Sequence, residues 1–223
     1  MKIQNYDIQD DENNDFVQLK SFMPNRCFRM LICAPSGGGK TNLLLDMIYR
    51  LLYFDKIYLY ARNLSQSKYK HLLKSLEPIS KEVGYDVIEA SNDEIIPLTD
   101  LSDENQKLII FDDYLNTGKK NDERIRDYFT NSRNKNCCCI YLSQSYYGTD
   151  KTIRLNIAHY CTLLHISSHY CIFDFPSRNE QSMICRELGV NKEDYQKATK
   201  DPYSFLYVDK IRKSNAKNFD ERI

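Results

Sequence analysis

A glycine-rich turn between an apolar run and an amphipathic stretch constrains the fold of this chain more than any other feature. Three of the seven glycines are consecutive, within Ala34-Pro-Ser-Gly-Gly-Gly-Lys40-Thr41. The segment matches the phosphate-binding pattern GxxxxGK[ST], except that Ala34, also a small residue, takes the place of the first glycine. The apolar run Cys27–Ala34 before it is typical of a buried strand, and Thr41–Phe54 after it has helical spacing of leucine and isoleucine. This order predicts a strand–loop–helix unit that binds a nucleoside triphosphate.

The residue types in this loop suit a bound triphosphate. Glycines let the backbone N–H groups approach the phosphate oxygens, and the start of the next helix carries partial positive charge. We expect Lys40 to neutralise the β- and γ-phosphate oxygens and the Thr41 hydroxyl to ligate Mg²⁺. The predicted nucleotide-binding residues are Ala34, Pro35, Ser36, Gly37, Gly38, Gly39, Lys40, Thr41 and Asn42.

Two other apolar runs end in polar residues that suit hydrolysis. Leu108–Phe111 runs into Asp112 and Asp113. Cys137–Leu142 leads through a serine to Gln144. Because ligands of parallel sheets bind at the carboxyl ends of the strands, we expect Asp112 to hold Mg²⁺, directly or through water. Asp113 is placed to orient or deprotonate the attacking water, and Gln144 to hydrogen-bond both that water and the γ-phosphate.

Strand-like and helical stretches alternate along the 223 residues, which predicts one α/β domain, a P-loop NTPase with a mainly parallel central sheet flanked by helices. The expected strands are Cys27–Ala34, Lys56–Arg62, Tyr85–Ala90, Lys107–Phe111, Cys137–Leu142, Ala158–Ile166 and Tyr203–Val208. The expected helices are Thr41–Phe54, Ser67–Val83 with an interruption near Pro78, Glu123–Asn131, Arg178–Leu188 and Asn191–Lys200. We expect a flexible acidic arm over residues 1–20, the P-loop domain over 21–210 and a basic tail over 211–223.

Composition excludes several classes of protein. Thirty-one Lys and Arg balance thirty-one Asp and Glu, so the protein has no globally basic surface for nucleic acid, although a local one remains open. No apolar run approaches the roughly 20 residues of a membrane span, so we expect no stable membrane insertion. The eight cysteines form no CxxC pair and several lie in apolar runs, which argues against a secreted disulfide framework and against zinc. These features predict an intracellular protein.

A second motif suggests another class of NTPase. Asn191-Lys-Glu-Asp194 matches NKxD, the guanine-reading signature of GTPases. In that class the motif ends a core strand, whereas here a helical stretch and a turn precede it. We therefore expect Asn191 to cap a helix and Asp194 to lie in its first turn.

A nucleotide kinase is the alternative from a different reaction class. Such an enzyme needs an arginine-rich lid, and Arg124, Arg126 and Arg133 lie close together in the sequence. A kinase would not explain the double aspartate or the strand that ends in glutamine. An ABC-type ATPase would need an LSGGQ-like segment, which the sequence lacks.

An ordered set of motifs resembles one family. The chain resembles the poxvirus-type DNA-packaging ATPases of the FtsK–HerA superfamily, which occur in large DNA viruses, virophages and related elements. The motifs that carry the resemblance are APSGGGKT, LIIFDD, TNSRNKN followed by CCCIYLSQ, and the late DPYSFLYVD. The resemblance covers about residues 26–210. It implies a RecA/FtsK–HerA-like ATPase that forms a homo-oligomeric ring of five or six subunits. Such a ring hydrolyses ATP with Mg²⁺ and drives double-stranded viral genomic DNA into a preformed capsid, at a capsid or vertex protein. The implied location is the host cytoplasm or virus factory, or the virion.

The resemblance also implies further site residues. Arg133 is the candidate trans-acting arginine that reaches a neighbour's γ-phosphate, and Arg154 is its rival. DNA contacts are expected from Lys119, Lys120 and Lys151, because the chain has no visible separate DNA-binding module. A HerA-like translocase of repair or plasmid transfer, a nucleotide kinase and a non-hydrolysing NTP-dependent scaffold remain the alternatives. The non-hydrolysing scaffold is disfavoured, because such a protein would not need the hydrolytic set of Asp112, Asp113 and Gln144.

Overall fold

In the part of the chain that the structure describes, a mixed sheet of nine strands forms the centre. The computed structural model describes residues 27–52, 54–114, 118–158, 168–210, 214–219 and 221–222. Within them the strand order is β3-β2-β4-β5-β1-β6-β7-β8-β9. The strands are β1 Arg29–Cys33, β2 Lys56–Ala61, β3 Ile88–Ser91, β4 Lys107–Asp112, β5 Cys137–Ser143, β6 Ser168–Phe173, β7 Phe205–Asp209, β8 Ser214–Lys217 and β9 Glu221–Arg222. The first six pair in parallel, and β7, β8 and β9 extend the sheet as antiparallel strands. The α/β prediction with a mainly parallel sheet is confirmed.

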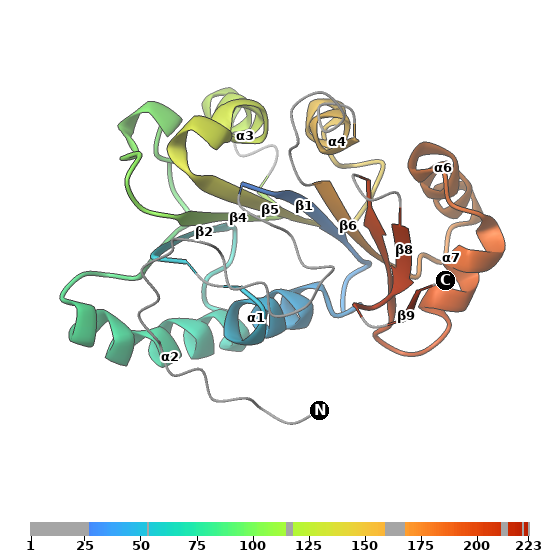
Figure 1. The fold of residues 1–223 in the computed structure, drawn as a ribbon, viewed down its shortest axis with the longest axis horizontal. Coiled ribbons are helices and arrows are strands. Elements are labelled where there is room, and N and C mark those ends of the chain that lie inside the picture. The colour runs from blue at the N-terminus through green and yellow to red at the C-terminus, as the bar shows by residue number, and fades with distance from the viewer. Residues whose placement is uncertain are drawn as a thin grey trace.

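Helices cover both faces of this sheet (Figure 1). They are α1 Lys40–Arg50, α2 Ser67–Val83, α3 Lys119–Asn131, α4 Lys151–Ala158, α6 Arg178–Leu188 and α7 Lys192–Thr199, with short 3-10 turns η1 Leu98–Asp100 and η2 Ser132–Lys135. In the view of Figure 1, α1 and α2 lie below the sheet, α3 and α4 lie above it, and α6 and α7 lie near its antiparallel end.

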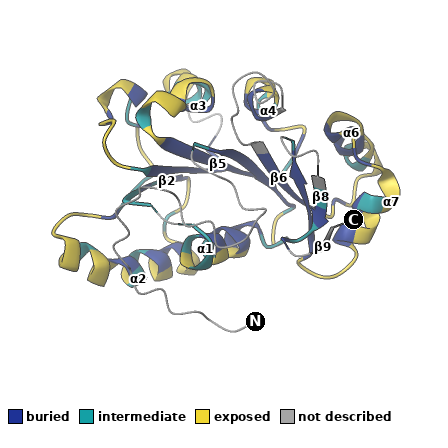
Figure 2. Cartoon of the chain, in the orientation of Figure 1, coloured by how far each residue is buried: buried dark blue, intermediate teal, exposed yellow. Residues whose placement is uncertain are grey.

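Alternate residues of the central strands feed two hydrophobic cores. In β1, Met30 and Ile32 join the core that α1 and α2 cover, whereas Leu31 and Cys33 join the core under α3, α4 and α6. Both faces of the strand are therefore buried away from solvent, which explains why the central strands are continuous apolar runs in the sequence. Figure 2 shows these strands buried along their length, with exposed residues on the outer faces of the helices.

Several of the secondary-structure predictions need correction. The helix α2 continues through Pro78, although an interruption was expected there. Its buried residues are Tyr69, Leu72 and Leu76, which all precede the proline. Their packing against the core stabilises the helix, so the helix tolerates the loss of the one backbone N–H donor that proline lacks. The helix α4 was not predicted at all, and Ala158 ends it instead of starting a strand. The rest of the predicted strand Ala158–Ile166 lies outside the described residues, and the described strand that follows, β6, begins only at Ser168.

The C-terminal residues belong to the sheet. A basic tail was expected over 211–223, but β8 and β9 in this range add two antiparallel strands. Two apolar side chains explain the docking, since Ala216 and Phe219 are buried and the Phe219 ring lies 5.1 Å from that of Phe205. The acidic arm predicted over 1–20 lies outside the described residues. Among the helices that the structure describes, none is long and apolar enough to cross a membrane.

Candidate active site

The glycine-rich loop connects the carboxyl end of β1 to the start of α1. Gly37 and Gly39 have φ of 77° and 101°, a region that residues with a side chain rarely adopt. A Cβ at Gly38 would lie 3.0 Å from the Pro35 carbonyl oxygen. Gly39 is the N-cap of α1 and provides no side-chain cap, so the first N–H groups of the helix remain available to an anion.

Asp112 ends β4 beside this loop and is largely buried, at 7% exposure. The phenol of Tyr69, from α2, donates a 2.5 Å hydrogen bond to its Oδ2. Its other oxygen, Oδ1, is buried without a hydrogen-bond partner among the described residues. Burial raises the pKa of Asp112, and the charge of Asp113 adds to this, while the Tyr69 hydrogen bond and Lys40 lower it. A buried, unpartnered carboxylate oxygen fits a divalent cation, which would both neutralise the group and satisfy the oxygen.

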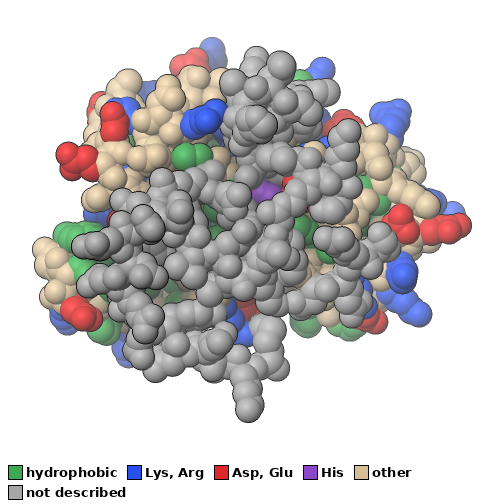
Figure 3. Space-filling view, in the orientation of Figure 1, with side chains coloured by type: hydrophobic (Ala, Val, Ile, Leu, Met, Phe, Trp, Pro, Cys, Tyr) green, Lys and Arg blue, Asp and Glu red, His purple; other side chains and the backbone are tan. Residues whose placement is uncertain are grey.

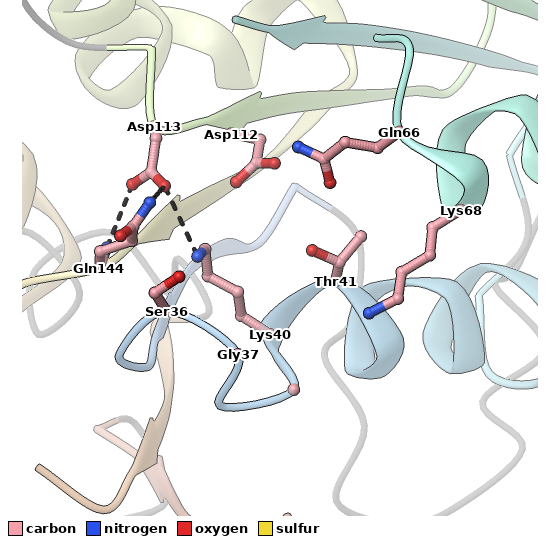
Figure 4. A pocket seen from close by; sticks show the side chains of 10 residues that line it. Ser36, Gly37, Lys40, Thr41, Gln66, Lys68, Asp112, Asp113 and Gln144 are labelled. Carbon is pink, nitrogen blue, oxygen red and sulfur yellow. Dashed lines mark hydrogen bonds and ion pairs between the residues drawn. The ribbon is translucent and has the colours of Figure 1, made fainter. Parts of the chain in front are cut away.

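Asp113 follows directly and turns toward the loop. Its backbone has φ of 48°, a left-handed conformation that Asp tolerates better than most residues, and its N–H donates to the Leu142 carbonyl at 3.0 Å. Gln144 donates to it twice, from the backbone N–H at 3.1 Å and from the side-chain Nε2 at 2.6 Å. The Lys40 ammonium lies 3.5 Å from its Oδ2. Lys40, Asp113 and Gln144 are thus brought together at the ends of three different elements (Figure 4).

A cavity of about 200 Å³ lies among these residues. Its lining is made of Ser36, Gly37, Gly39, Lys40, Thr41, Gln66, Lys68, Asp112, Asp113 and Gln144. Most of these were predicted from the sequence, but Gln66 and Lys68 were not. Both precede or begin α2, and Figure 4 shows the Gln66 amide directed toward Asp112 and the Lys68 ammonium toward Thr41. The only available signal was their place after the strand β2, whose carboxyl end lies at the same edge of the sheet.

The loop after Gln144 is held by a carboxylate from α6. Glu180 Oε1 accepts from the Tyr146 N–H at 2.6 Å and from the Ser145 hydroxyl at 3.0 Å. The side chain of Ser177 caps the same helix by accepting from the Glu180 N–H. This contact, which the sequence did not suggest, fixes the backbone next to Gln144.

The two candidate arginines have different surroundings. Arg133 lies in η2, which leads into the amino end of β5, and is exposed. It is therefore at the sheet edge opposite the phosphate loop of its own chain. Arg154 is only 12% exposed at its side chain, pairs with Glu187 at 2.7 Å and lies 5.1 Å over the Tyr146 ring. The structure thus commits Arg154 to contacts within the chain.

The three candidate lysines lie at the starts of two adjacent helices. Lys119 and Lys120 begin α3, and Lys151 begins α4, both helices being on the same face of the sheet. Each helix follows a strand whose carboxyl end bears site residues, so the lysines share the site's edge of the sheet. All three are exposed, and Lys120 is ion-paired with Glu94. On the face shown in Figure 3, Lys and Arg side chains lie interspersed with Asp and Glu around the rim.

The prediction for the NKxD segment is confirmed. Asn191 is the N-cap of α7 and accepts from the Glu193 N–H at 2.9 Å, with Asp194 in the first turn. The segment is therefore a helix start and not the end of a core strand. The described cysteines are free thiols, and burial raises the pKa of Cys33, Cys138 and Cys171.

Comparisons with known proteins agree with this geometry. The family model described as Poxvirus A32 protein matches residues 17–193. The crystal structure of B204, the DNA-packaging ATPase of Sulfolobus turreted icosahedral virus, is 14% identical, with a TM-score of 0.57 over 86% of this chain and 96% of that one. B204 of Sulfolobus turreted icosahedral virus 2 in complex with AMP is 13% identical, with a TM-score of 0.56. Its complex with ATP-gammaS is 12% identical, with a TM-score of 0.54, and both cover the same shares of the two chains. At these identities the likeness shows the fold. No curated protein matches the chain.

Proposed function

The chain belongs to the poxvirus A32 protein family, and from that premise we propose that it is an ATP-hydrolysing motor that moves double-stranded viral genomic DNA into a preformed capsid. The B204 structures that share its fold are described as a genome packaging NTPase bound to ATP-gammaS and as a DNA-packaging ATPase, which supports the same role here.

One observation carries the enzymatic part of this proposal. Lys40, Asp113 and Gln144 converge at one edge of the sheet, where Asp113 accepts from Gln144 at 2.6 Å and pairs with Lys40 at 3.5 Å. A purely structural turn would not need a cation, a carboxylate and an amide around a polar cavity at the start of a glycine-capped helix. Such a set binds a phosphate, orients a water molecule and accepts its proton.

Mg²⁺ would be held by the Thr41 hydroxyl and by Asp112, whose buried Oδ1 lacks a partner among the described residues. There it would supply positive charge to offset the negative charge that develops on the phosphate oxygens. Tyr69 keeps Asp112 oriented through its hydrogen bond to the other carboxylate oxygen.

The ion pair of Lys40 and Asp113 suggests how substrate activates its own hydrolysis. Phosphate oxygens of ATP would compete with Asp113 for the Lys40 ammonium. Released from Lys40 but still held by Gln144, Asp113 would then be free to accept a proton from water beside the γ-phosphate.

The motor part of the proposal concerns neighbouring subunits and DNA. Arg133 is exposed at the sheet edge opposite its own phosphate loop, and this position supports a role at the site of another subunit. Lys119 and Lys151 are exposed at the starts of adjacent helices, where they would contact DNA phosphates. Contacts with phosphates alone suffice for a motor that does not read the DNA sequence. Membership of the family supports the other parts of the proposal, namely a homo-oligomeric ring, a capsid or vertex partner and action inside the infected cell.

The test is ATP turnover with and without double-stranded DNA, with Lys40→Ala as the blank. We expect strong stimulation by DNA of any sequence, weakened by salt. Turnover that DNA does not change, together with phosphate transfer to a nucleotide acceptor, would instead establish the kinase. Binding to capsid protein distinguishes packaging from a repair or plasmid-transfer translocase.

A further inference from the structure

Tyr203 has three unusual properties for a large aromatic residue. Its side chain is 70% exposed, the highest value among the exposed large hydrophobic residues of the described chain. Its φ of 62° lies in the left-handed region, which a bulky residue rarely adopts. It also lies against the phosphate loop, since a Cβ at Gly39 would be 3.1 Å from its Cδ1 atom.

The backbone around Tyr203 is a fixed turn. The Ser204 N–H donates to the Asp201 carbonyl at 3.0 Å, and the Ser204 hydroxyl donates to the same oxygen at 2.7 Å. An ion pair between Lys217 and Asp201 ties this turn to β8. Tyr203 occupies the third position, after Pro202, where positive φ favours glycine or asparagine. The turn alone would therefore be less strained with glycine or asparagine at this position. Backbone strain of this kind is concentrated at functional sites.

The position of Tyr203 in the sheet relates it to the nucleotide. The groups expected at the γ-phosphate, Asp113 and Gln144, follow β4 and β5, on one side of β1. Tyr203 precedes β7, and Phe173 ends β6, on the other side of β1. Both rings approach the same point at the start of α1, because the Cβ of Gly39 would lie 3.4 Å from Phe173.

The cavity leaves the base of the nucleotide outside it. Its volume of about 200 Å³ is below the roughly 300–1,000 Å³ of pockets that enclose a drug-sized ligand, and its described lining is polar or glycine. This suits a triphosphate with its metal ion. If the γ-phosphate lies at Asp113, the ribose and base of the nucleotide extend away from Asp113, past Gly39 and toward Tyr203.

We propose that the exposed ring of Tyr203, next to Phe173, is the stacking platform for the purine base of the bound nucleotide. The inference rests on the proposed function and adds to it the residue that binds the base. Stacking uses the π-face that every base has, so the platform binds purines without selecting among them.

The experiment compares two ligands with and without a base. Calorimetric titrations with Mg²⁺ measure a non-hydrolysable ATP analogue and inorganic triphosphate on the wild type, Tyr203→Gly and Tyr203→Phe. We expect Tyr203→Gly to weaken binding of the analogue about 5- to 150-fold, as loss of a base–aromatic stack does, and to leave binding of triphosphate unchanged. Tyr203→Phe keeps the ring and should bind both ligands as the wild type does.

Thermal unfolding excludes a folding defect as the cause. Glycine relieves the positive φ, so Tyr203→Gly without ligand should unfold at a temperature no lower than the wild type. Tyr85→Ala removes another exposed tyrosine, 45% exposed at the end of α2, and should change neither ligand. If Tyr203→Gly weakens the binding of both ligands equally, or leaves binding of the analogue unchanged, the role of Tyr203 as a stacking platform is refuted and the proposed function is not. A wild type that binds neither ligand would overturn the proposed function as well.

Discussion

Tyr69→Phe removes one hydroxyl group and leaves the helix packing in place, so it tests how this hydroxyl affects the ionisation of Asp112. In the wild type this hydroxyl donates a 2.5 Å hydrogen bond to Asp112 Oδ2 inside a buried environment. Hydrogen bonds to charged groups contribute about 1.5–3 kcal/mol. The bond favours the ionised carboxylate, so its loss raises the pKa of Asp112 further in the direction in which burial has already moved it.

The magnitude follows from competition between the proton and Mg²⁺ for the same carboxylate. At pH below the pKa of Asp112, Mg²⁺ must displace a proton, and the variant holds that proton more tightly by about 1.5–3 kcal/mol. The concentration of Mg²⁺ that gives half-maximal hydrolysis should therefore rise about 10- to 150-fold at acidic pH. At alkaline pH both proteins are ionised, and the difference should shrink toward zero.

The assay is ATP hydrolysis titrated with Mg²⁺ at a series of pH values. Tyr49→Phe is the matched control, because its hydroxyl lies 2.8 Å from the Ser75 hydroxyl on an exposed surface. It should follow the wild type at every pH. A loss in Tyr69→Phe that is the same at all pH values would refute the reasoning, since it would mean a packing defect and not a change in the ionisation of Asp112.

Stability gives an independent readout of the same group. Because burial raises the pKa of Asp112 above its ordinary value, the folded state holds this proton more tightly than the unfolded chain. Its contribution to stability is thus fully present below the ordinary value and is lost as pH rises through the raised pKa. Mg²⁺ should compensate for that loss, so it should raise the thermal midpoint more at neutral than at acidic pH.

Three other perturbations test the remaining site residues. Asp113→Asn should lower hydrolysis about 10²- to 10⁴-fold and retain ATP binding, measured by single-turnover and equilibrium binding, as expected for loss of a general base. Arg133→Ala should retain ATP binding but lose about 10³–10⁵ in rate in the assembled ring. Mixing it with Lys40→Ala subunits, which supply the arginine, should restore turnover, and failure of this rescue would rule out action in trans. Replacing Lys119 and Lys151 together by alanine should reduce the slope of log DNA affinity against log salt by about two, with DNA-free turnover unchanged.

Sequence patterns predicted the part of the site that depends on local structure. The phosphate loop, Asp112, Asp113 and Gln144 each follow directly from a buried apolar strand. In a parallel sheet such strand ends must converge, so no knowledge of the strand order was needed. The same logic correctly rejected the NKxD segment, because its surroundings predicted a helix cap at Asn191.

Features that depend on pairing between distant segments could not be predicted in this way. The antiparallel strands β8 and β9 are short and partly basic, and they are stabilised by the burial of Ala216 and Phe219 against β7. Glu180 reaches the loop after Gln144 from a helix that has its own complete cap. Neither contact leaves a periodic signal in the sequence.

Tyr69 shows most clearly why the rest of the site required the structure. In the sequence it is one apolar position of an amphipathic helix, together with Leu72 and Leu76, and its burial is explained by the core alone. It reaches Asp112 because β2, which leads into α2, is the neighbour of β4 in the sheet. Strand order is set by how whole faces pack, and local patterns do not encode it. A residue that the sequence assigns to the core can therefore control Asp112, the carboxylate that we propose to bind Mg²⁺, through a hydroxyl group that hydrophobic packing does not require.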